Sequence, residues 1–290
     1  MTPSEREFVK RELQKTGYPL EDKVASILSE LLENCDIEPN YYYTDWQTED
    51  SRELDLKVTY EVTSRPITIE YIFLIECKRL PGHVWAFIES RQRPFLFKDS
   101  VSIWDHIEKI GRQEPVVEIL KSLTKLDEIE CDIYSHRFKE IILDAKKSNK
   151  RGDNIRSATI GLAKAMYYEQ KRDNSLNKML RENIKRESDY IRIYYPLIVF
   201  EGKMYGAKML PDVDPRRISS AHLHHFSLQK GKEMEMIIDV VGSQSLRDFI
   251  RDKFLLEVNM IRKKEAKLRN SYLELIKRLM LSEKRYLGPA

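Results

Sequence analysis

Cysteine, long apolar runs and a strong excess of one charge are all scarce in this 290-residue sequence. The three cysteines, Cys35, Cys77 and Cys131, lie far apart and form no C-x-x-C pair. They argue against a disulfide framework and a cysteine zinc site, and they predict a reducing cytoplasm. No apolar stretch approaches the ~20 residues of a membrane helix, and the first residues lack a signal peptide's apolar segment. We therefore expect a cytoplasmic protein without a membrane segment.

Charged residues are abundant but nearly balanced in sign. Lysine and arginine total 50 against 47 aspartates and glutamates, which leaves a formal net charge of +3. This mild excess neither requires nor excludes a nucleic-acid partner, because local clustering matters more than the sum. Hydrophobic residues make up 41% of the chain, enough for a substantial core. The length suits one elaborated domain or two modest ones.

The first part of the chain predicts two helices followed by three strands. Ser4 and Glu7 have the spacing of a capping box, which favours a helix to about Lys15. A second helix is expected to begin near Pro19 and to continue, with apolar residues at helical spacing, to about Asn34. Alternating apolar residues then predict strands at 41–46, 53–62 and 67–78, the last two joined as a hairpin through 63–66.

The rest of the chain is less regular at first and then alternates helix and strand. Pro81-Gly82 predicts a break that opens an irregular, aromatic-rich insertion at about 79–156. We expect the insertion to form a mobile cover beside the strand at 67–78, with its basic end, 146–156, facing the acid and lysine at the end of that strand. Within and after the insertion we expect a helix at 115–123, strands at 138–143, 190–201, 223–228 and 234–241, a helix at 157–172, and one or two amphipathic helices at 245–285.

The stretch 70–78, Glu-Tyr-Ile-Phe-Leu-Ile-Glu-Cys-Lys, carries the clearest functional signal. Read as a strand, it places Glu76 and Lys78 on one face at the end of an apolar run. A buried acid and lysine are costly unless they have partners or a function. The usual function of such a pair is to bind a divalent metal and to direct a water molecule toward phosphorus. Acid-x-Lys alone is weak, because it occurs seven times in this chain.

The order helix, three antiparallel strands, helix, strand gives this pair its context. With Glu21, Asp55 and Glu76-Cys77-Lys78, this order resembles the PD-(D/E)XK nuclease superfamily. Asp55 precedes Glu76 by 21 residues, which suits two strands of one hairpin; Leu54 stands where the family name has proline. The resemblance implies an α/β fold with a restriction-endonuclease-like core within 1–242, followed by a helical extension at 243–290. It covers residues 17–90 well, and the return helix and strand more loosely.

The resemblance also implies a chemistry, the hydrolysis of phosphodiester bonds with Mg²⁺, for which Mn²⁺ can substitute. Asp55 and Glu76 would be metal ligands, with the Cys77 backbone carbonyl as a third; Mg²⁺ prefers one or two carboxylates plus waters and phosphate oxygens. Lys78 would orient or help deprotonate the attacking water, and Glu21 would hold a metal-bound water or a second ion. DNA is the expected substrate, in restriction or antiviral defence, and RNA stays open.

Other interpretations of these residues stay open. Glu76 and Lys78 also fit a solvated strand end, Lys57 could be the working lysine, and Glu21 could be a simple helix N-terminal acid. Glu53 shares a face with Asp55 and is either a surface acid or part of the site. Two further groups have a core interpretation and a functional one: the histidines His222, His224 and His225 as zinc ligands, and the aromatic residues Trp85 and Phe87 as base-stacking residues.

The C-terminal part bears on partners. Between 247 and 285 there are twelve lysines and arginines against six acids, which fits a solvated helix face or a phosphate-contacting one. The apolar stripe from Leu246 to Ile261 needs a covering surface, and we expect a homodimer. No DNA-reading module is recognisable, so a separate partner would choose the target. A non-catalytic nucleic-acid-binding or scaffold protein is the alternative to an enzyme.

Overall fold

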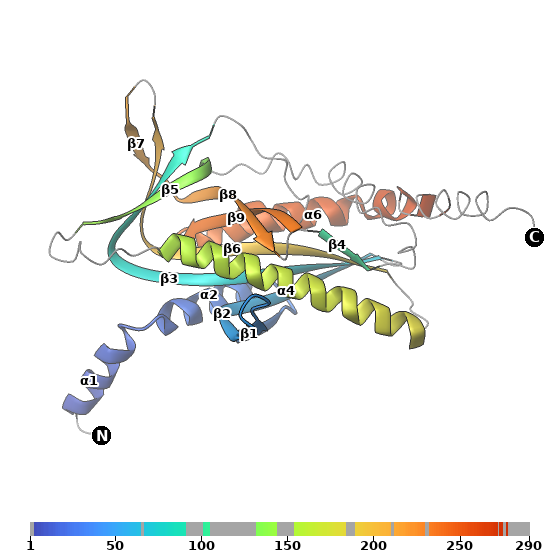
Figure 1. Ribbon diagram of the computed structural model, residues 1–290, viewed down its shortest axis with the longest axis horizontal. Helices are drawn as coiled ribbons and strands as arrows, with labels where there is room; N and C mark the ends of the chain where they lie inside the picture. Colours follow the sequence, from blue (N-terminus) through green and yellow to red (C-terminus); the bar gives the residue numbers. More distant parts are fainter. Residues whose placement is uncertain are drawn as a thin grey trace, which may run out of the picture.

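The computed structural model describes residues 3–64, 67–90, 101–104, 132–143, 154–183, 189–209, 212–229 and 232–271, together with 273, 274 and 277. Within these residues the chain forms a mixed α/β fold around one nine-stranded sheet (Figure 1). The α/β class expected from the sequence is thus confirmed. No helix in the described part is long and apolar enough to cross a membrane.

The elements follow one another in three groups. The first group comprises α1 (Pro3–Leu13), α2 (Tyr18–Leu31), β1 (Asp36–Thr44), β2 (Ser51–Ser64) and β3 (Ile67–Glu89). The second comprises β4 (Val101–Trp104), β5 (Tyr134–Ile142), α4 (Asn154–Asn183) and β6 (Asp189–Lys208). The third comprises β7 (Asp214–Arg217), β8 (Ser220–Gln229), β9 (Lys232–Gly242) and one continuous helical segment made of α5 (Leu246–Phe249), the π-helical turn η4 (Ile250–Phe254) and α6 (Leu255–Lys263).

The centre of the sheet is a meander followed by a parallel return strand. Strands β1, β2 and β3 pair antiparallel in sequence order. After α4, strand β6 lies parallel to β3, with Glu76 opposite Ile198 and Lys78 opposite Phe200. The far side of β6 pairs with β9, also in parallel, where Leu197 meets Asp239. The order helix, meander, helix, parallel strand is therefore present.

Helices cover both faces of this central part, and the alternation of strand side chains decides which residues each helix meets. On β3, Phe73 and Ile75 belong to the apolar core cluster that contains α2 and the C-terminal helical segment. Ile72 and Leu74 point the other way, into the cluster beneath α4. In Figure 1, α4 crosses the near face of the sheet and α6 lies behind it. The continuous apolar run of β3 is thus buried on both sides.

The C-terminal apolar stripe is buried against the molecule's own sheet. Phe254 packs edge-on to Tyr71, at 4.9 Å between ring centroids, and to Phe73, at 4.7 Å. The other stripe residues share the same core cluster: Leu246, Phe249, Ile250, Val258 and Ile261. The described part of the extension 243–290 is therefore packed into the main core. The stripe that motivated the homodimer is already covered, so it offers no surface to a second copy.

The sequence prediction is wrong just after Lys78, where β3 does not end. Gly82 adopts a left-handed backbone, with φ +86°, and residues 80–83 bulge out of the ladder before the strand resumes at Val84. A bulge is a place where a strand tolerates proline and bends. Trp85 and Phe87 are both fully buried, and Trp85 stacks on Phe200 at 3.9 Å between ring centroids. These two aromatics are core residues, not base-stacking ones.

Other boundaries also move. Strand β1 begins at Asp36 instead of 41, and α4 begins close to the expected 157, at Asn154, but runs well beyond 172, to Asn183. A short strand, β4, pairs with β6 inside the region expected to be irregular. Three predictions fall outside the described residues: the helix at 115–123, most of the basic segment 146–156, and the end of the C-terminal helices.

A carboxyl group lies buried in the core between the C-terminal segment and the sheet. Glu257 is 1% exposed, and its Oε1 accepts a 2.7 Å hydrogen bond from the Tyr71 hydroxyl. Burial raises the pKa of Glu257 to about 8, the Tyr71 hydrogen bond opposes the rise, and the nearby Asp239 carboxylate adds to it. Glu257 is therefore protonated in the folded protein at neutral pH, whereas it ionises near its ordinary value after unfolding.

Stability should fall as pH rises from about 4.5 to about 8, because in that window the folded state holds a proton that the unfolded state releases. Glu257→Gln mimics the protonated acid and should remove this part of the pH dependence. We expect the melting temperature of the wild type to drop by several degrees more than that of Glu257→Gln across this window. Thermal melts at successive pH values measure it, and parallel curves for the two proteins would contradict it.

Candidate active site

The paired strands β2 and β3 bring the candidate acids together. Their last register pair is Leu56 with Ile75, so the next position on each strand is Asp55 and Glu76. Asp55 Oδ2 accepts a 2.6 Å hydrogen bond from the backbone N–H of Cys77. This bond fixes the Asp55 carboxylate beside the end of the apolar run of β3. The acid and the Glu76-Cys77-Lys78 stretch are therefore neighbours, as the sequence predicts.

A local irregularity in β1 places Asp55 at a change of strand face. Asn40 lies opposite Asp55 between the pairs Pro39–Leu56 and Tyr41–Leu54, and its φ of +50° interrupts the ladder there. Asparagine tolerates this left-handed conformation better than most residues. On one side of the interruption Leu56 packs toward α2, and on the other Leu54 packs toward α4. Asp55 thus sits at a kink rather than within a regular ladder.

Glu76 is nearly buried beneath α4 and is paired with Lys78. Its residue exposure is 7%, and Oε2 accepts a hydrogen bond from the Lys78 ammonium. A Cβ on Gly161 of α4 would lie 3.3 Å from Glu76 Oε1. The Tyr43 hydroxyl donates a 3.3 Å hydrogen bond to the Gly161 carbonyl beside this contact. A glycine in the middle of α4 therefore lets the helix pass close to the carboxylate.

Glu21 reaches the site from the first turn of α2. Its side chain folds back over Gly17, the residue that precedes the helix. The two are so close that a Cβ on Gly17 would lie 2.6 Å from Glu21 Oε1. Asp55 raises the pKa of Glu21 and Lys78 lowers it, so both charges act on this carboxylate. The structure thus brings all four predicted residues, Glu21, Asp55, Glu76 and Lys78, into one electrostatic group.

The carboxylates of this group hold protons more tightly than isolated acids do. Burial raises the pKa of Glu76 to about 7; Lys78 opposes the rise, and Asp55 and Glu21 add to it. Burial, then Asp55, raises the pKa of Glu21 to about 7. Burial also raises the pKa of Asp55, and the Cys77 N–H opposes it. Close acids that disfavour each other's ionisation are a common feature of functional sites.

The pKa of Lys78 is also raised, but by its charged neighbours and against the effect of burial. Burial lowers its pKa, but the Glu76 and Asp55 carboxylates outweigh burial and raise the pKa above the ordinary lysine value. Lys78 is therefore a protonated, hydrogen-bonding cation in this arrangement. That state suits a residue that orients water and not one that removes its proton.

The donor set fits a hard cation that keeps much of its water shell. Two carboxylates, Asp55 and Glu76, and the Cys77 carbonyl are the kind of ligands that Mg²⁺ takes, with water and phosphate oxygens completing the shell. Among the described residues, no group of three or more His, Cys, Asp or Glu side chains is arranged to hold a metal ion. Glu21 therefore stands outside the direct ligand set, where it can act through water.

Lys57, the alternative working lysine, is engaged elsewhere. Its side chain is 5% exposed, and its ammonium lies 2.8 Å from Glu38 Oε1 and 3.8 Å from Glu169 Oε2. It also lies 4.4 Å above the centre of the Tyr41 ring. Lys57 thus links β1, β2 and α4 and does not face the acids of the site. Glu53, the other open residue, is exposed and lies near enough to raise the pKa of Glu21.

The three histidines do not form a metal site. His222 pairs with the Asp239 carboxylate, and His224 meets His136 at 2.9 Å and Glu235 at 2.6 Å through its two different ring nitrogens. Burial lowers the pKa of His225. As stated above, the described residues contain no side-chain group arranged for a metal, so the zinc interpretation loses its support.

Two residues at the site escaped the reading of the sequence. Gly161 and Tyr43 both lie against Glu76, and Tyr43 is buried. The signal for Gly161 was its position in the interior of an otherwise good helix, where glycine is unfavourable without a packing reason. Tyr43 carried no comparable signal.

Comparisons with known proteins do not extend this picture. No family model matches the chain, and neither the curated proteins nor the solved structures give a match.

Removing Lys57 should destabilise the protein. Lys57→Ala leaves the fully buried Glu169 with fewer positive partners, and we expect a loss of about 1–3 kcal/mol in the free energy of unfolding. Urea unfolding measures it. Lys23→Ala, at an exposed position of α2, is the matched control and should stay within about 0.5 kcal/mol of wild type. Equal stability of the two variants would show that the Lys57 contacts contribute nothing.

Proposed function

We propose that this chain is a Mg²⁺-dependent nuclease of restriction-endonuclease-like fold that hydrolyses phosphodiester bonds in DNA. The observation that carries the proposal is the grouping of Asp55, Glu76 and Lys78 where the pairing of β2 with β3 ends, with Glu21 near enough for its charge to act on them. Four residues singled out from sequence pattern and family resemblance interact electrostatically, although they come from three different elements, α2, β2 and β3. An adventitious strand end would not account for Glu21 arriving from α2.

The order of elements supports the same proposal. The family's core consists of a helix, an antiparallel meander, a second helix and a return strand, and α2, β1–β3, α4 and β6 occur in that order, with β6 parallel to β3. The proposed acids lie where the meander meets the return strand. This likeness is one of topology and residues; strands β4, β5, β7, β8 and β9 have no counterpart in it.

The mechanism assigns each residue a separate task. Asp55, Glu76 and the Cys77 carbonyl would hold the metal, which when bound neutralises phosphate charge and makes a nucleophilic water available. The Lys78 ammonium, fixed by its hydrogen bond to Glu76, orients the attacking water. Glu21 accepts a hydrogen bond from a second water at the edge of the site. Because Gly161 has no side chain, α4 can pack directly against the Glu76 carboxylate and restrict the movement of that carboxylate.

A non-catalytic nucleic-acid-binding protein is the second candidate function. Its support is the lack, among the described residues, of a group of three side-chain metal ligands. Under this alternative the Glu76–Lys78 pair is a structural ion pair. RNA cleavage would use the same residues, so the substrate is decided by the assay. Restriction or antiviral defence, with a separate partner that chooses the target, is the setting we propose.

Lys78→Ala should abolish most cleavage while leaving nucleic-acid binding in place. Removal of one positioned hydrogen-bond donor costs about 10²–10³-fold in rate. Glu76→Gln should do at least as much damage, because it removes a proposed metal ligand. Cleavage is measured on plasmid, linear DNA, single strands and RNA with Mg²⁺, Mn²⁺ or EDTA, and binding by electrophoretic mobility shift at several salt concentrations.

Lys57→Ala is the matched control on the neighbouring strand. Assayed below its melting temperature, it should cleave at close to the wild-type rate. A wild-type protein that cleaves nothing with any divalent metal would reject the enzyme and favour the binding protein. A Lys78→Ala variant as fast as wild type would reject the mechanism.

A further inference from the structure

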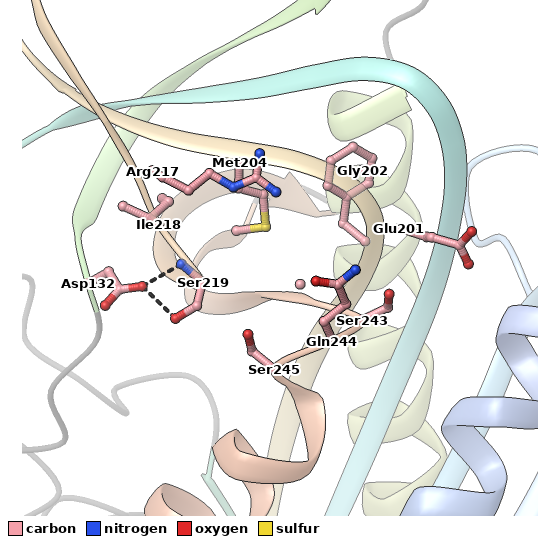
Figure 2. A pocket seen from close by; sticks show the side chains of 12 residues that line it. Asp132, Glu201, Gly202, Met204, Arg217, Ile218, Ser219, Ser243, Gln244 and Ser245 are labelled. Atoms are coloured by element: carbon pink, nitrogen blue, oxygen red, sulfur yellow. Dashed lines mark hydrogen bonds between the residues drawn. The ribbon is translucent and has the colours of Figure 1, made fainter.

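The bend after the site creates a second feature that the proposed mechanism does not use. In the β3–β6 ladder, Arg79 pairs with Glu201 and Val84 with Lys203, so four residues of β3 stand opposite the single Gly202 of β6. The Phe200 ring folds over that glycine: a Cβ there would lie 2.2 Å from it. Both strands turn here, and beside the turn of β6 lies a cavity of about 390 Å³ (Figure 2).

Besides Asp132, three segments line the cavity, at the place where the parallel ladder between β6 and β9 ends. They are the turn of β6 at Gly202, the β7–β8 connection at 217–219, and the turn 242–245 between β9 and α5. Phe200, which lines the cavity, is the register partner of Lys78. Neighbouring strands lie roughly 4.8 Å apart, so the cavity begins about one strand away from the proposed active site. Ligands of α/β sheets commonly bind at this end of parallel strands.

Both polar and apolar groups line this cavity, and Arg217 lies on the same side as Met204 and Ile218 (Figure 2). Figure 2 shows the side chains of Arg217, Gln244, Ser243 and Ser245 around it, with Met204 and Ile218 as the apolar part. The Arg217 guanidinium lies 5.5 Å from the centre of the Tyr205 ring, and this cation–π contact helps to hold the Arg217 side chain in place. A cation, an amide and hydroxyls around an apolar wall suit a small ligand with both an anionic and a flat aromatic part.

The two acids at the cavity are already engaged. Asp132 accepts hydrogen bonds from Ser219 N–H at 2.6 Å, Ser219 Oγ at 2.7 Å and Ser220 N–H at 2.9 Å. Burial raises the pKa of Asp132, but these hydrogen bonds outweigh it and lower the pKa overall. Glu201 pairs with Arg79 at 3.1 Å and points away from the cavity in Figure 2. Both carboxylates therefore have hydrogen-bond or ion-pair partners other than Arg217.

We propose that this cavity binds one unstacked nucleotide of a single strand, next to the phosphate that is cleaved. The inference rests on the proposed nuclease function for the identity of the ligand. Arg217 would contact the nucleotide's phosphate, and Gln244 the hydrogen-bonding edge of its base. A concave cavity of this size encloses a base only when that base has left the stack. The chain therefore prefers single strands, or unpaired nucleotides, over intact duplex.

The test compares two double variants that remove the same residue types. Arg217→Ala/Gln244→Ala removes two polar side chains that line the cavity, both at exposed positions. Arg11→Ala/Gln14→Ala removes the same charge and amide from α1 and the turn after it, which lie away from the sheet (Figure 1). Fluorescence anisotropy in EDTA, where cleavage is stopped, gives the affinities for a labelled single strand and for the corresponding duplex. Circular dichroism confirms folding.

We expect the cavity variant to lose about 10- to 100-fold in affinity for the single strand, the range of a lost hydrogen bond to a charged group. Its duplex affinity should fall much less, and the α1 variant should match wild type for both. Equal single-strand affinity of the two double variants would overturn the inference. So would a wild type that binds duplex more tightly than single strand.

Binding in EDTA separates this inference from the proposed function. If the wild type cleaves and the cavity variant binds normally, the nuclease stands and the nucleotide site falls. If no protein cleaves but the cavity variant still loses single-strand binding, the nucleotide site stands and the nuclease falls. Gln244→Glu is the second variant: it keeps the side-chain size and adds a negative charge, so it should also weaken single-strand binding, and an unchanged affinity would count against the site.

Discussion

The parallel ladder between β3 and β6 is the constraint on which the rest of the structure depends. It runs from Ile67 to Arg79 in register with β6 and resumes at Val84. The ladder places Glu76 and Lys78 beside the return strand, and because β3 also pairs with β2, Asp55 lies on the other side of β3. The two helical layers cover the opposite faces of this ladder. Its interruption opposite Gly202 falls between the proposed site and the cavity.

Buried polar contacts, not apolar packing alone, fix α4 over this ladder. Asp173 of α4 is fully buried and pairs with Arg192 of β6, which also meets Glu70 of β3. Such ion pairs add little net stability compared with apolar groups of the same shape, but losing one partner costs several kcal/mol. They fix the register of the helix against the sheet. The position of Gly161 over Glu76 depends on that register.

The sequence could predict the hairpin and its acids, because strand alternation and turn residues are local signals. The four site residues came from the same signals together with the family resemblance. The sequence could not predict that β3 continues through Pro81-Gly82, because this continuation depends on pairing with β5, some fifty residues later. The role of Lys57 was equally hidden, because Glu169 comes from a distant helix. Non-local pairing and contacts between elements decide these cases.

The charge balance of the site bears on the choice between enzyme and binding protein. Three carboxylates, Glu21, Asp55 and Glu76, lie near one ammonium; burial raises the pKa of each, and the Asp55 charge adds to the rise for Glu21 and Glu76. A surface that only binds nucleic acid has no use for such acids, because they repel the phosphates that its lysines and arginines attract. A divalent cation between the carboxylates reverses the local sign and turns the same residues into a phosphate site. The acids are therefore a burden to a binding protein and an asset to a metal-dependent nuclease, which is why their grouping supports the enzyme.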